Sequence, residues 1–404
     1  MSRILFAWEL GANLGHLSRD IPVAEKLREA GHDVVFAVRD TRVATEILTP
    51  KRFHFIQSPI FIGRVHLNEP PANYAEVLEA EGWCDRIALR GHLQAWLSIM
   101  SMGNFDAVVA DHAPGALVAA HIAGRIGIAF GNGFEIPPDL EPMPTIRPWQ
   151  RYSRDRLLTS QCRVLADINA VVTDLGGIRL ARLGQIFPVN PIFATFAELD
   201  HYGQRRGAYY VGSIHGINHA TEVLWPSTDS RRVMVYLRMH HQAATLVMTA
   251  LEELSVSAIC VIPGADAQFK AKYQSETISI VEHPVALGPF LENADALIGY
   301  GSVGVMTEAL LKGVPLLMIP STVEQYLVAK RAEEIGTGIL IDGVPNRERI
   351  RAAITSLLSE VHFKVHALEF AERYPQITAE RAANDVAQLI IRRLTFPEKN
   401  SLPM

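Results

Sequence analysis

The sequence is poor in cysteine and lacks long hydrophobic runs. Its 404 residues include three cysteines, Cys84, Cys162 and Cys260, which lie far apart and form no Cys-x-x-Cys pair. This pattern predicts buried, reduced thiols rather than a disulfide framework, a zinc site or a redox motif. No apolar run approaches the roughly 20 residues of a membrane-spanning helix, and the N-terminal run reaches Glu9 too soon for a secretory signal. We therefore expect a cytoplasmic protein without a transmembrane segment, with peripheral contact to a membrane left open.

Positive charge and metal-binding motifs are also scarce. The formal net charge is −5 at pH 7. Because a nucleic-acid-binding protein usually carries a basic face, we expect no nucleic-acid partner. The sequence holds no Asp-x-Asp pair that would bind a divalent cation, and we expect no metal. The apolar share of 49% is typical of a globular protein, and a chain of 404 residues favours two or three domains.

Short apolar runs alternate with amphipathic segments along the chain, which is the pattern of parallel α/β sheets. In the first half we predict strands over residues 3–8, 33–38, 105–110, 126–130 and 168–172, and helices over 17–30, 74–97 and 116–122. In the second half we predict strands over 233–237, 258–262, 278–281 and 295–298, and helices over 243–254 and 378–394. Two such series imply two doubly wound parallel-sheet domains, 1–200 and 207–377. The C-terminal segment 378–404 is expected to pack back on the first domain.

Ligands of such sheets bind beyond the carboxyl ends of the strands. We therefore expect the two domains to face one another across a cleft. The Pro-rich run 136–148 is predicted to be a loop over that cleft, and residues 195–206 are predicted to link the domains.

The stretch 298–338 (IGYGSVGVMTEALLKGVPLLMIPSTVEQYLVAKRAEEIGTG) carries the clearest local motif. A predicted strand ends at a turn that holds Gly301, Ser302 and Gly304, and a predicted helix follows. Glycine lets a ligand approach the backbone, and the first N–H groups of a helix have no partner within it, so a phosphate fits there. A second interpretation is a tight turn whose glycines serve only packing.

Taken together, the motifs resemble the nucleotide-sugar glycosyltransferases with the GT-B fold, in particular the bacterial members of the UDP-glycosyltransferase-like group (family 1). The resemblance covers nearly the whole chain. In the first half it is carried by Gly15-His16, Gly31-His32-Asp33-Val34, Glu198–Tyr202 and Tyr209–Gly212. In the second half it is carried by His283-Pro284-Val285, 294–297, Gly301, Glu308-Ala309-Leu310, Gly313-Val314-Pro315, Pro320 and Glu324-Gln325. It implies an acceptor-binding first domain and a donor-binding second domain.

The resemblance implies that His16 is the catalytic base, which removes a proton from the acceptor hydroxyl, and that Asp111 orients it and stabilises its charge. A neutral imidazole with an ordinary pKa of about 6.5 suits this work. Both residues follow predicted strands, which places them at the same edge of the sheet. From the residues alone, His16 could instead be a helix-start histidine bonded to backbone, and Asp111 an ordinary helix N-cap. His112 could also take the role of Asp111.

The resemblance further implies a donor site made of Met239, His240, Tyr300, Gly301, Ser302, Gly304, Glu324 and Gln325. The glycine turn would hold the diphosphate through backbone N–H groups and a hydroxyl. The carboxylate and amide of the Glu-Gln pair would bind sugar hydroxyls, unless the pair is only a solvent-facing helix start. The Met-His pair follows the first strand of its domain, where family members have residues that touch the phosphates.

Three features of the donor site depart from the family pattern. Tyr300 stands where family members usually carry a diphosphate-binding histidine, and Ser302 stands where glycine is common. A tyrosine supplies one hydrogen bond but no positive charge, and His240 and His241 are candidates to supply that charge. Residues 281–284 lack the family's tryptophan that stacks on the base, which puts the identity of the nucleotide in doubt.

The sequence therefore predicts an inverting, metal-independent glycosyltransferase with a UDP- or dTDP-sugar as co-substrate and no further cofactor. The acceptor is expected to be a small molecule or a lipid, selected by residues 41–100 and 134–160. Two alternatives stay open. A nucleotide-sugar epimerase of the same architecture would need no acceptor, and a non-catalytic protein that binds nucleotide sugars would fit the tyrosine at position 300.

Overall fold

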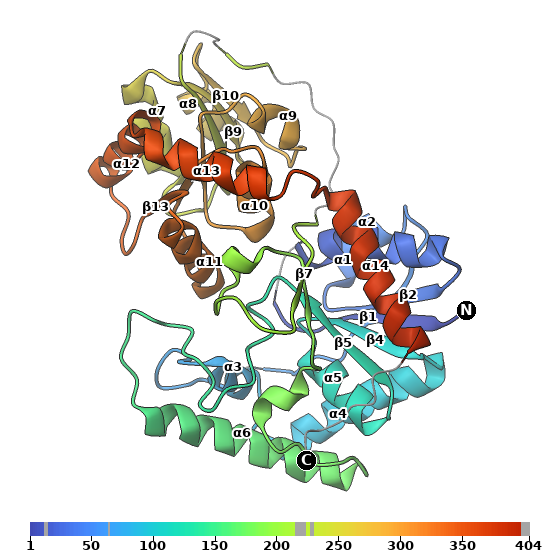
Figure 1. Cartoon of the computed structure of the whole chain (residues 1–404). Helices are drawn as coiled ribbons and strands as arrows, with labels where there is room; N and C mark the ends of the chain where they lie inside the picture. Colours follow the sequence, from blue (N-terminus) through green and yellow to red (C-terminus); the bar gives the residue numbers. More distant parts are fainter. Residues whose placement is uncertain (12–14, 64, 215–223, 227–229, 397–404) are drawn as a thin grey trace. The chain divides into compact units, whose positions relative to one another are not determined.

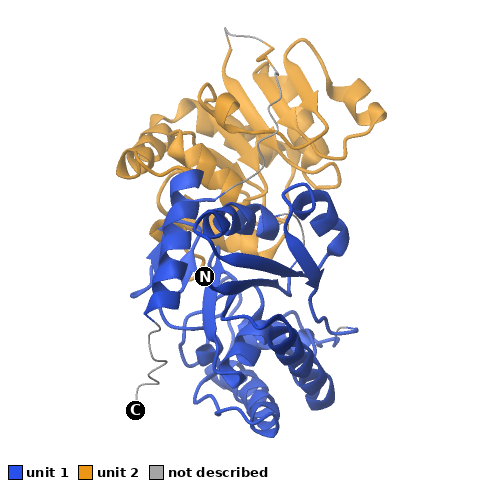
Figure 2. Cartoon of the chain, turned by 90° about the vertical axis from the view of Figure 1, so that its right-hand side faces the viewer, with its two compact units in different colours: residues 1–196, 204–216, 379–404 blue, residues 197–203, 217–378 orange. Residues whose placement is uncertain are grey.

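The computed structural model describes residues 1–11, 15–63, 65–214, 224–226 and 230–396. The chain forms two compact units (Figure 2). Unit 1 comprises Met1–Phe196, Gln204–Gly216 and Ala379–Met404, and unit 2 comprises Ala197–Gly203 and Ile217–Thr378. Residues 12–14, which precede Gly15-His16 in the sequence, and residues 397–404, at the end of the predicted C-terminal segment, lie outside the described residues.

Unit 1 is built on a parallel sheet of seven strands in the order β3-β2-β1-β4-β5-β6-β7. The strands are β1 (Arg3–Trp8), β2 (Asp33–Val38), β3 (His54–Gln57), β4 (Ala107–Asp111), β5 (Ile126–Gly131), β6 (Ile192–Phe193) and β7 (Tyr209–Tyr210). The central strands are buried apolar runs, as expected for a parallel sheet that is covered on both faces. Along β1, Leu5 and Ala7 join one core cluster while Ile4 and Phe6 join the other.

Helices cover both faces of this sheet. They are α1 (Gly15–Glu29), α2 (Thr41–Leu48), α3 (Tyr74–Ala80), α4 (Arg86–Gly103), α5 (Pro114–Ile122), α6 (Arg154–Asp174) and α14 (Ala379–Thr395), with a short 3₁₀ turn, η1 (Leu183–Ile186). The helix α14 packs along α1 through Ala382, Val386 and Ile390 (Figure 1). The C-terminal helix therefore belongs to the core of unit 1.

The predicted strand over residues 168–172 is wrong, because these residues lie inside α6. Val164, Ile168 and Val171 are buried there at helical spacing. A short apolar run does not distinguish a buried strand from one face of a helix. The sheet continues instead through β6 and β7, which are too short to leave a pattern in the sequence.

Two further predictions need correction. The predicted helix over 74–97 is interrupted, because Gly82 has a φ of 99° and Asp85 starts α4 by accepting from the N–H groups of Ile87 and Ala88. The three cysteines are free, as predicted. However, one of them, Cys260, is buried, whereas Cys162 is exposed on the outer face of α6 and Cys84 is half-buried.

Unit 2 has a parallel sheet of six strands in the order β10-β9-β8-β11-β12-β13. The strands are β8 (Arg232–Tyr236), β9 (Ser257–Val261), β10 (Ile278–Val281), β11 (Ala296–Gly299), β12 (Leu316–Met318) and β13 (Gly338–Leu340). Around them lie η2 (Ala197–Leu199), α7 (Ala244–Leu254), α8 (Ala267–Tyr273), α9 (Gly288–Leu291), α10 (Val303–Leu311), α11 (Val323–Glu334), α12 (Arg347–Ser359) and α13 (Val361–Arg373). The predicted pair of parallel-sheet domains is thus confirmed.

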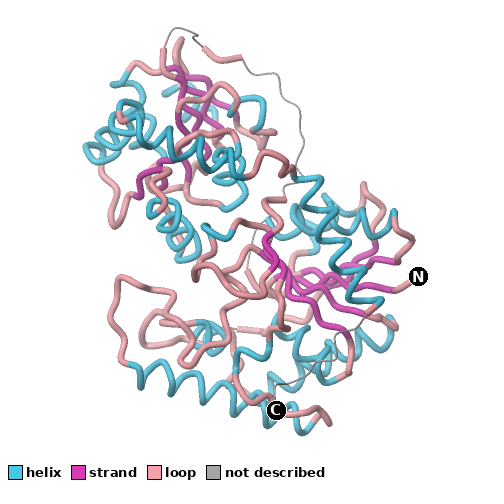
Figure 3. Tube along the Cα trace, in the orientation of Figure 1, coloured by secondary structure: helices cyan, strands magenta, loops and turns pink. Residues whose placement is uncertain are grey.

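In both sheets the strand order reverses beside the first strand of the unit, at β1–β4 and at β8–β11. Figure 3 shows the two sheets as separate groups of strands with helices around them. The register places Trp8 opposite Asp111 in unit 1 and Tyr236 opposite Gly299 in unit 2. Because ligands of open α/β sheets bind at such switch points, these two strand pairs mark where a functional site is expected in each unit.

Candidate active site and donor site

His16 and Asp111 meet at the switch point of unit 1. Asp111 is the last residue of β4 and is fully buried, whereas His16, in the first turn of α1, keeps 15% of its side chain exposed. Nδ1 of His16 lies 2.9 Å from Oδ1 of Asp111. Since a carboxylate only accepts hydrogen bonds, Nδ1–H donates and the lone pair of the neutral ring is on Nε2. The structure therefore brings the two predicted residues into the geometry of an oriented base.

The His16 ring is held on two further sides. Trp8 stacks on it, with the ring centroids 5.2 Å apart and the ring planes at 25°. Gly11 has a φ of 80°, and a Cβ at this position would lie 2.7 Å from Nε2 of His16. A side chain at position 11 would therefore displace the ring.

Arg19 is not among the predicted site residues, yet it is bonded directly to Asp111. Its Nη2 lies 2.5 Å and 2.6 Å from the two oxygens of Asp111, and 3.2 Å from Oε1 of Glu135. Burial by itself would raise the pKa of Asp111, but the charges and hydrogen bonds of Arg19 and His16 hold that pKa well below its ordinary value. Asp111 is therefore a carboxylate at neutral pH. In the sequence, the only indication that Arg19 belongs to this site is its position three residues after His16, on the same helix face.

His112, the alternative to Asp111, lies beside the ring of His16. Burial and the neighbouring His16 lower the pKa of His112 to about 3, so its ring is neutral. The ring centroid lies 6.1 Å from that of His16 and 6.2 Å from that of Tyr74. The backbone of His112 has a φ of 51°, and its carbonyl accepts a 2.9 Å hydrogen bond from the N–H of Leu10.

In unit 2 the predicted glycine turn connects β11 to α10. Gly301 has a φ of 85°, and a Cβ there would lie 3.0 Å from the carbonyl oxygen of Gln325. The turn therefore packs directly on the first turn of α11. Ser302 is the N-cap of α10, but its side chain makes no capping hydrogen bond within the described chain. The start of α10 thus presents backbone N–H groups and a hydroxyl at the switch point, as an anion requires.

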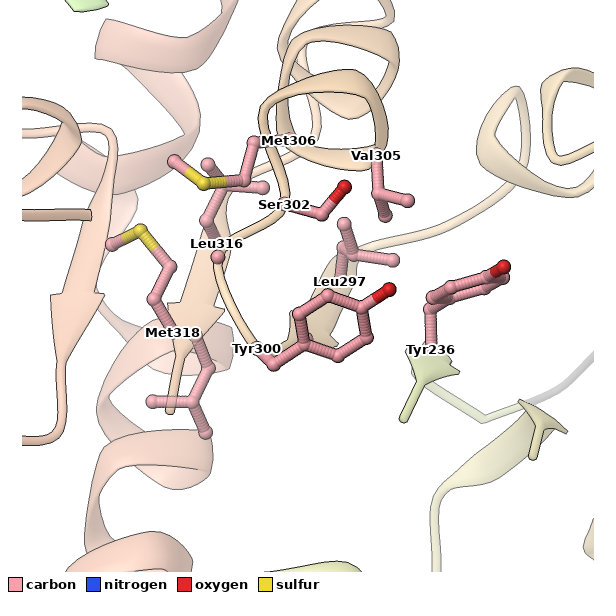
Figure 4. Close-up of a pocket in the computed structure, with 11 residues that line it drawn as sticks. Tyr236, Leu297, Tyr300, Ser302, Val305, Met306, Leu316 and Met318 are labelled. Atoms are coloured by element: carbon pink, nitrogen blue, oxygen red, sulfur yellow. The ribbon is translucent and has the colours of Figure 1, made fainter. Parts of the chain in front are cut away.

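A small pocket opens at this turn (Figure 4). Tyr236, Tyr300 and Ser302 contribute to its lining. The figure shows the two tyrosine rings side by side, and their centroids lie 6.1 Å apart. Burial and the neighbouring Tyr300 raise the pKa of Tyr236 to about 12, and burial also raises the pKa of Tyr300. Both hydroxyls are therefore protonated at neutral pH and can donate hydrogen bonds.

Arg238 brings positive charge to this pocket, although the sequence did not single it out. It lies beside Tyr300, where its charge and hydrogen bond oppose the rise in the pKa of Tyr300 that burial causes. His241, by contrast, is occupied by backbone. Its Nε2 lies 2.9 Å from the carbonyl oxygen of Ile319, and its Nδ1 accepts from the N–H of Ala243 at 3.2 Å. Arg238 therefore supplies positive charge at Tyr300, whereas His241, whose pKa is lowered by burial, stacks on the Tyr300 ring with the centroids 6.3 Å apart.

The other predicted donor residues lie on the turn after β8 and in the first turn of α11. Met239 packs against the core, and His240 is exposed on the same turn. The Oε1 atom of Gln325 accepts from the N–H of Ser321 at 2.9 Å, so its amide also shapes the loop before α11. The charge of Glu324 contributes to the raised pKa of Tyr300, which places this carboxylate near the pocket.

Two features are absent from the described ranges. No group of three or more His, Cys, Asp or Glu side chains is arranged there to hold a metal ion. None of the helices in these ranges is both long enough and apolar enough to cross a membrane.

Comparison with known proteins adds independent findings. Residues 246–392 match the family described as Erythromycin biosynthesis protein CIII-like, C-terminal domain. The chain is 24% identical to a PGL/p-HBAD biosynthesis glycosyltransferase of Mycobacterium tuberculosis, over 92% of this chain and 88% of the relative. It is 28% identical to 4'-demethylrebeccamycin synthase of Lentzea aerocolonigenes, over 41% of this chain and 39% of the relative.

Solved structures share the fold over nearly the whole chain. Glycosyltransferase VinC in complex with DTDP is 15% identical and matches with a TM-score of 0.69, over 97% of this chain and 99% of VinC. Spinosyn rhamnosyltransferase SpnG complexed with spinosyn aglycone is 15% identical, with a TM-score of 0.65, over 96% of this chain and 100% of SpnG. The chain is a GT-B glycosyltransferase homologue.

The sequence relatives of the chain include glycosyltransferases, and the solved structures that share its fold are glycosyltransferases as well. The region that matches the family, 246–392, includes the turn at Gly301 and the first turn of α11. His16, Arg19 and Asp111 lie outside that region, in unit 1.

Proposed function

We propose that this protein transfers a sugar from a nucleoside-diphosphate sugar to a hydroxyl group of a small-molecule or lipid acceptor, with inversion and without a metal ion. The observation that carries the proposal is the 2.9 Å contact between Nδ1 of His16 and Oδ1 of Asp111. Nε2 of His16 takes the proton of the acceptor hydroxyl, and the carboxylate stabilises the imidazolium that forms. The acceptor oxygen attacks the anomeric carbon as the diphosphate leaves, and a single displacement inverts the configuration.

The groups around Gly301 support a role in holding the leaving diphosphate. Backbone N–H groups at the start of α10 and the hydroxyl of Ser302 bind phosphate oxygens, and Arg238 supplies the positive charge that Tyr300 lacks. A helix N-terminus beside a guanidinium stabilises such charge without a metal. In this proposal Glu324 and Gln325 bind hydroxyls of the sugar, and Met239 and His240 lie against the phosphates.

The relatives and the exposed apolar side chains favour particular classes of donor and acceptor. The DTDP complex of VinC favours a dTDP-sugar beside a UDP-sugar as the co-substrate, with no further cofactor. The aglycone complex of SpnG favours a small-molecule acceptor. Within the segments 41–100 and 134–160, Ile60, Ile62 and Trp149 expose apolar side chains, which suits an apolar acceptor. We place the reaction in the cytoplasm.

The test is donor binding and cleavage by the purified protein. UDP-, dTDP- and GDP-sugars are screened for a rise in Tm and for release of nucleoside diphosphate, with and without EDTA. The variants are His16→Ala and, as a matched control, His54→Ala, whose side chain is exposed on β3. We expect one donor to stabilise all three proteins, and to be cleaved by the wild type and the control but not by His16→Ala.

Other outcomes would overturn parts of the proposal. If no nucleotide sugar raises the Tm at millimolar concentration, the donor site is not functional and a partner role takes its place. If EDTA abolishes turnover, the reaction depends on a metal ion. Once an acceptor is found, NMR of the product decides between inversion and retention at the anomeric carbon.

A further inference from the structure

Asp20 is a buried carboxyl group beside the base and its partner. It follows Arg19 on α1, and 1% of its surface is exposed. His16, Arg19 and Asp20 stand at i, i+3 and i+4, so they share one face of the helix. Neither oxygen of Asp20 has a hydrogen-bond partner among the described residues. An ionised carboxylate in such a place would lose its hydration without compensation.

The charged groups around Asp20 make ionisation still less favourable. Arg19 comes from α1, Asp111 from the end of β4 and Glu135 from the loop after β5. Since Arg19 is the single cation among these three groups, they already sum to −1 before Asp20 is counted. Burial and the charge of Asp111 raise the pKa of Asp20 well above its ordinary value, although Arg19 opposes the rise.

Two other helices, α2 and α14, also pack on α1. Among the described residues, α2 and α14 contact α1 through apolar side chains such as Ala44, Ala383 and Val386. The ion pairs that α1 makes with α14 and with the loop after α2, Lys26–Glu380 and Glu25–Lys51, lie toward its C-terminal end.

We propose that Asp20 is a positioning residue for the base, which is protonated in the working enzyme and donates a hydrogen bond from its carboxyl group to Asp111. Two carboxyl groups can bond to each other only when one of them carries the proton. Asp111 is the neighbouring group whose charge most raises the pKa of Asp20, so the two carboxyl groups are neighbours in the buried cluster. The inference rests on the proposed role of His16 as the base.

The charges of the buried cluster show how the proton on Asp20 affects Asp111. When His16 takes the acceptor proton, two cations, His16 and Arg19, face two carboxylates, Asp111 and Glu135, and a neutral Asp20 leaves the buried cluster without net charge. An ionised Asp20 would leave it at −1, and would repel Asp111 from its place against Nδ1 of His16. The proton on Asp20 therefore keeps Asp111 aligned with the imidazole.

The kinetic test is the pH profile of kcat/KM for the wild type, Asp20→Asn and Asp20→Leu, with the exposed Asp174→Asn as a control. Asparagine is neutral and keeps an N–H donor, so we expect Asp20→Asn to retain kcat and the apparent pKa of the acidic limb. Leucine has no donor, and we expect kcat to fall about tenfold or more. If Asp20 is ionised instead, Asp20→Asn removes a negative charge beside the dyad and lowers the apparent pKa of the limb. That shift would overturn the proposal.

A second measurement needs no turnover and separates this inference from the proposed function. Protein labelled with ¹³C at the aspartate carboxyl carbons is titrated by NMR, and the Asp20 signal is assigned by its loss in Asp20→Asn. We expect the chemical shift of a protonated carboxyl at neutral pH. A carboxylate shift at that pH would refute the proposal, even in a preparation that transfers no sugar. Asp20→Asn and this spectrum decide the question if Asp20→Leu does not fold.

Discussion

Trp8 and Asp111 stand opposite each other on the neighbouring strands β1 and β4, and both hold the same imidazole ring. Trp8 stacks on His16, and Asp111 accepts from its Nδ1. The parallel pairing of two strand ends thus sets both the plane of the ring and its tautomer. A base positioned by strands of the sheet is held more rigidly than one positioned by a loop alone.

Loss of the carboxylate at position 111 should disable the base while leaving the fold in place. In Asp111→Asn the amide keeps the shape of the side chain but removes the charge that stabilises the imidazolium and can favour the wrong tautomer. We expect kcat to fall by about 10² to 10⁴, measured as steady-state release of nucleoside diphosphate. The exposed Asp174→Asn, treated in the same way, should match the wild type. Equal kcat values for the two variants would contradict the role of Asp111.

The glycine turn offers a matched pair of substitutions. Gly301→Ala places a methyl group at a φ of 85° and 3.0 Å from the carbonyl oxygen of Gln325, so the turn must shift. Gly304→Ala adds a methyl group where no atom lies within 4 Å, inside α10. By calorimetry we expect Gly301→Ala to bind the nucleoside diphosphate about tenfold more weakly and Gly304→Ala to bind it normally. Equal binding by both variants would show that the turn does not touch the phosphates.

Arg238 should matter for the phosphates and not for the nucleoside. A hydrogen bond to a charged group contributes about 1.5–3 kcal/mol. We therefore expect Arg238→Ala to weaken the binding of the nucleoside diphosphate by about tenfold or more and Arg238→Lys to weaken it less. Binding of the nucleoside without phosphates is the internal control and should not change. A parallel loss for both ligands would instead indicate a general distortion of the pocket.

The lowered pKa of His112 predicts that the folded protein loses stability in mild acid. Its folded pKa of about 3 lies below the ordinary value of 6.5, so between these values the unfolded state binds a proton that the folded state does not. The contribution of the neutral His112 ring to the stability of the folded state is therefore full above about pH 6.5 and is lost as the pH falls toward 3. His112→Asn removes this titration, and asparagine tolerates the φ of 51°. We expect the Tm of this variant to fall less than that of the wild type between pH 7 and pH 4.5, and an equal fall would contradict the assignment.

The raised pKa of Asp20 predicts that the folded protein loses stability as the pH rises. Its folded pKa is raised, so its contribution to stability is full below the unfolded pKa of about 4 and is lost as the pH rises through the folded value. Asp20→Asn does not titrate. We therefore expect its Tm, relative to that of the wild type, to increase as the pH rises above about 4. A constant difference between the two Tm values across this range would show that the carboxyl ionises normally.

Much of the fold could be predicted because its signals are local. The strands around residues 233–237, 258–262, 278–281 and 295–298 are apolar runs between turns, and each occurs within one residue of its predicted position. The pattern failed at residues 168–172, where the same apolar signal belongs to one face of a long helix. Local periodicity does not report what a segment packs against.

The sequence by itself determined two parallel α/β domains, the glycine turn at Gly301 and the placement of His16 and Asp111 at the same edge of the first sheet. These features depend on residues close together in the chain or on the strand order that such a pattern implies. Only the tertiary structure decided which groups meet, namely Arg19 with Asp111 and Glu135, and Arg238 with Tyr300. The physical reason is that burial and ion pairing depend on which side chains the fold brings into contact, and these partners are distant in sequence or lie at turns without a pattern.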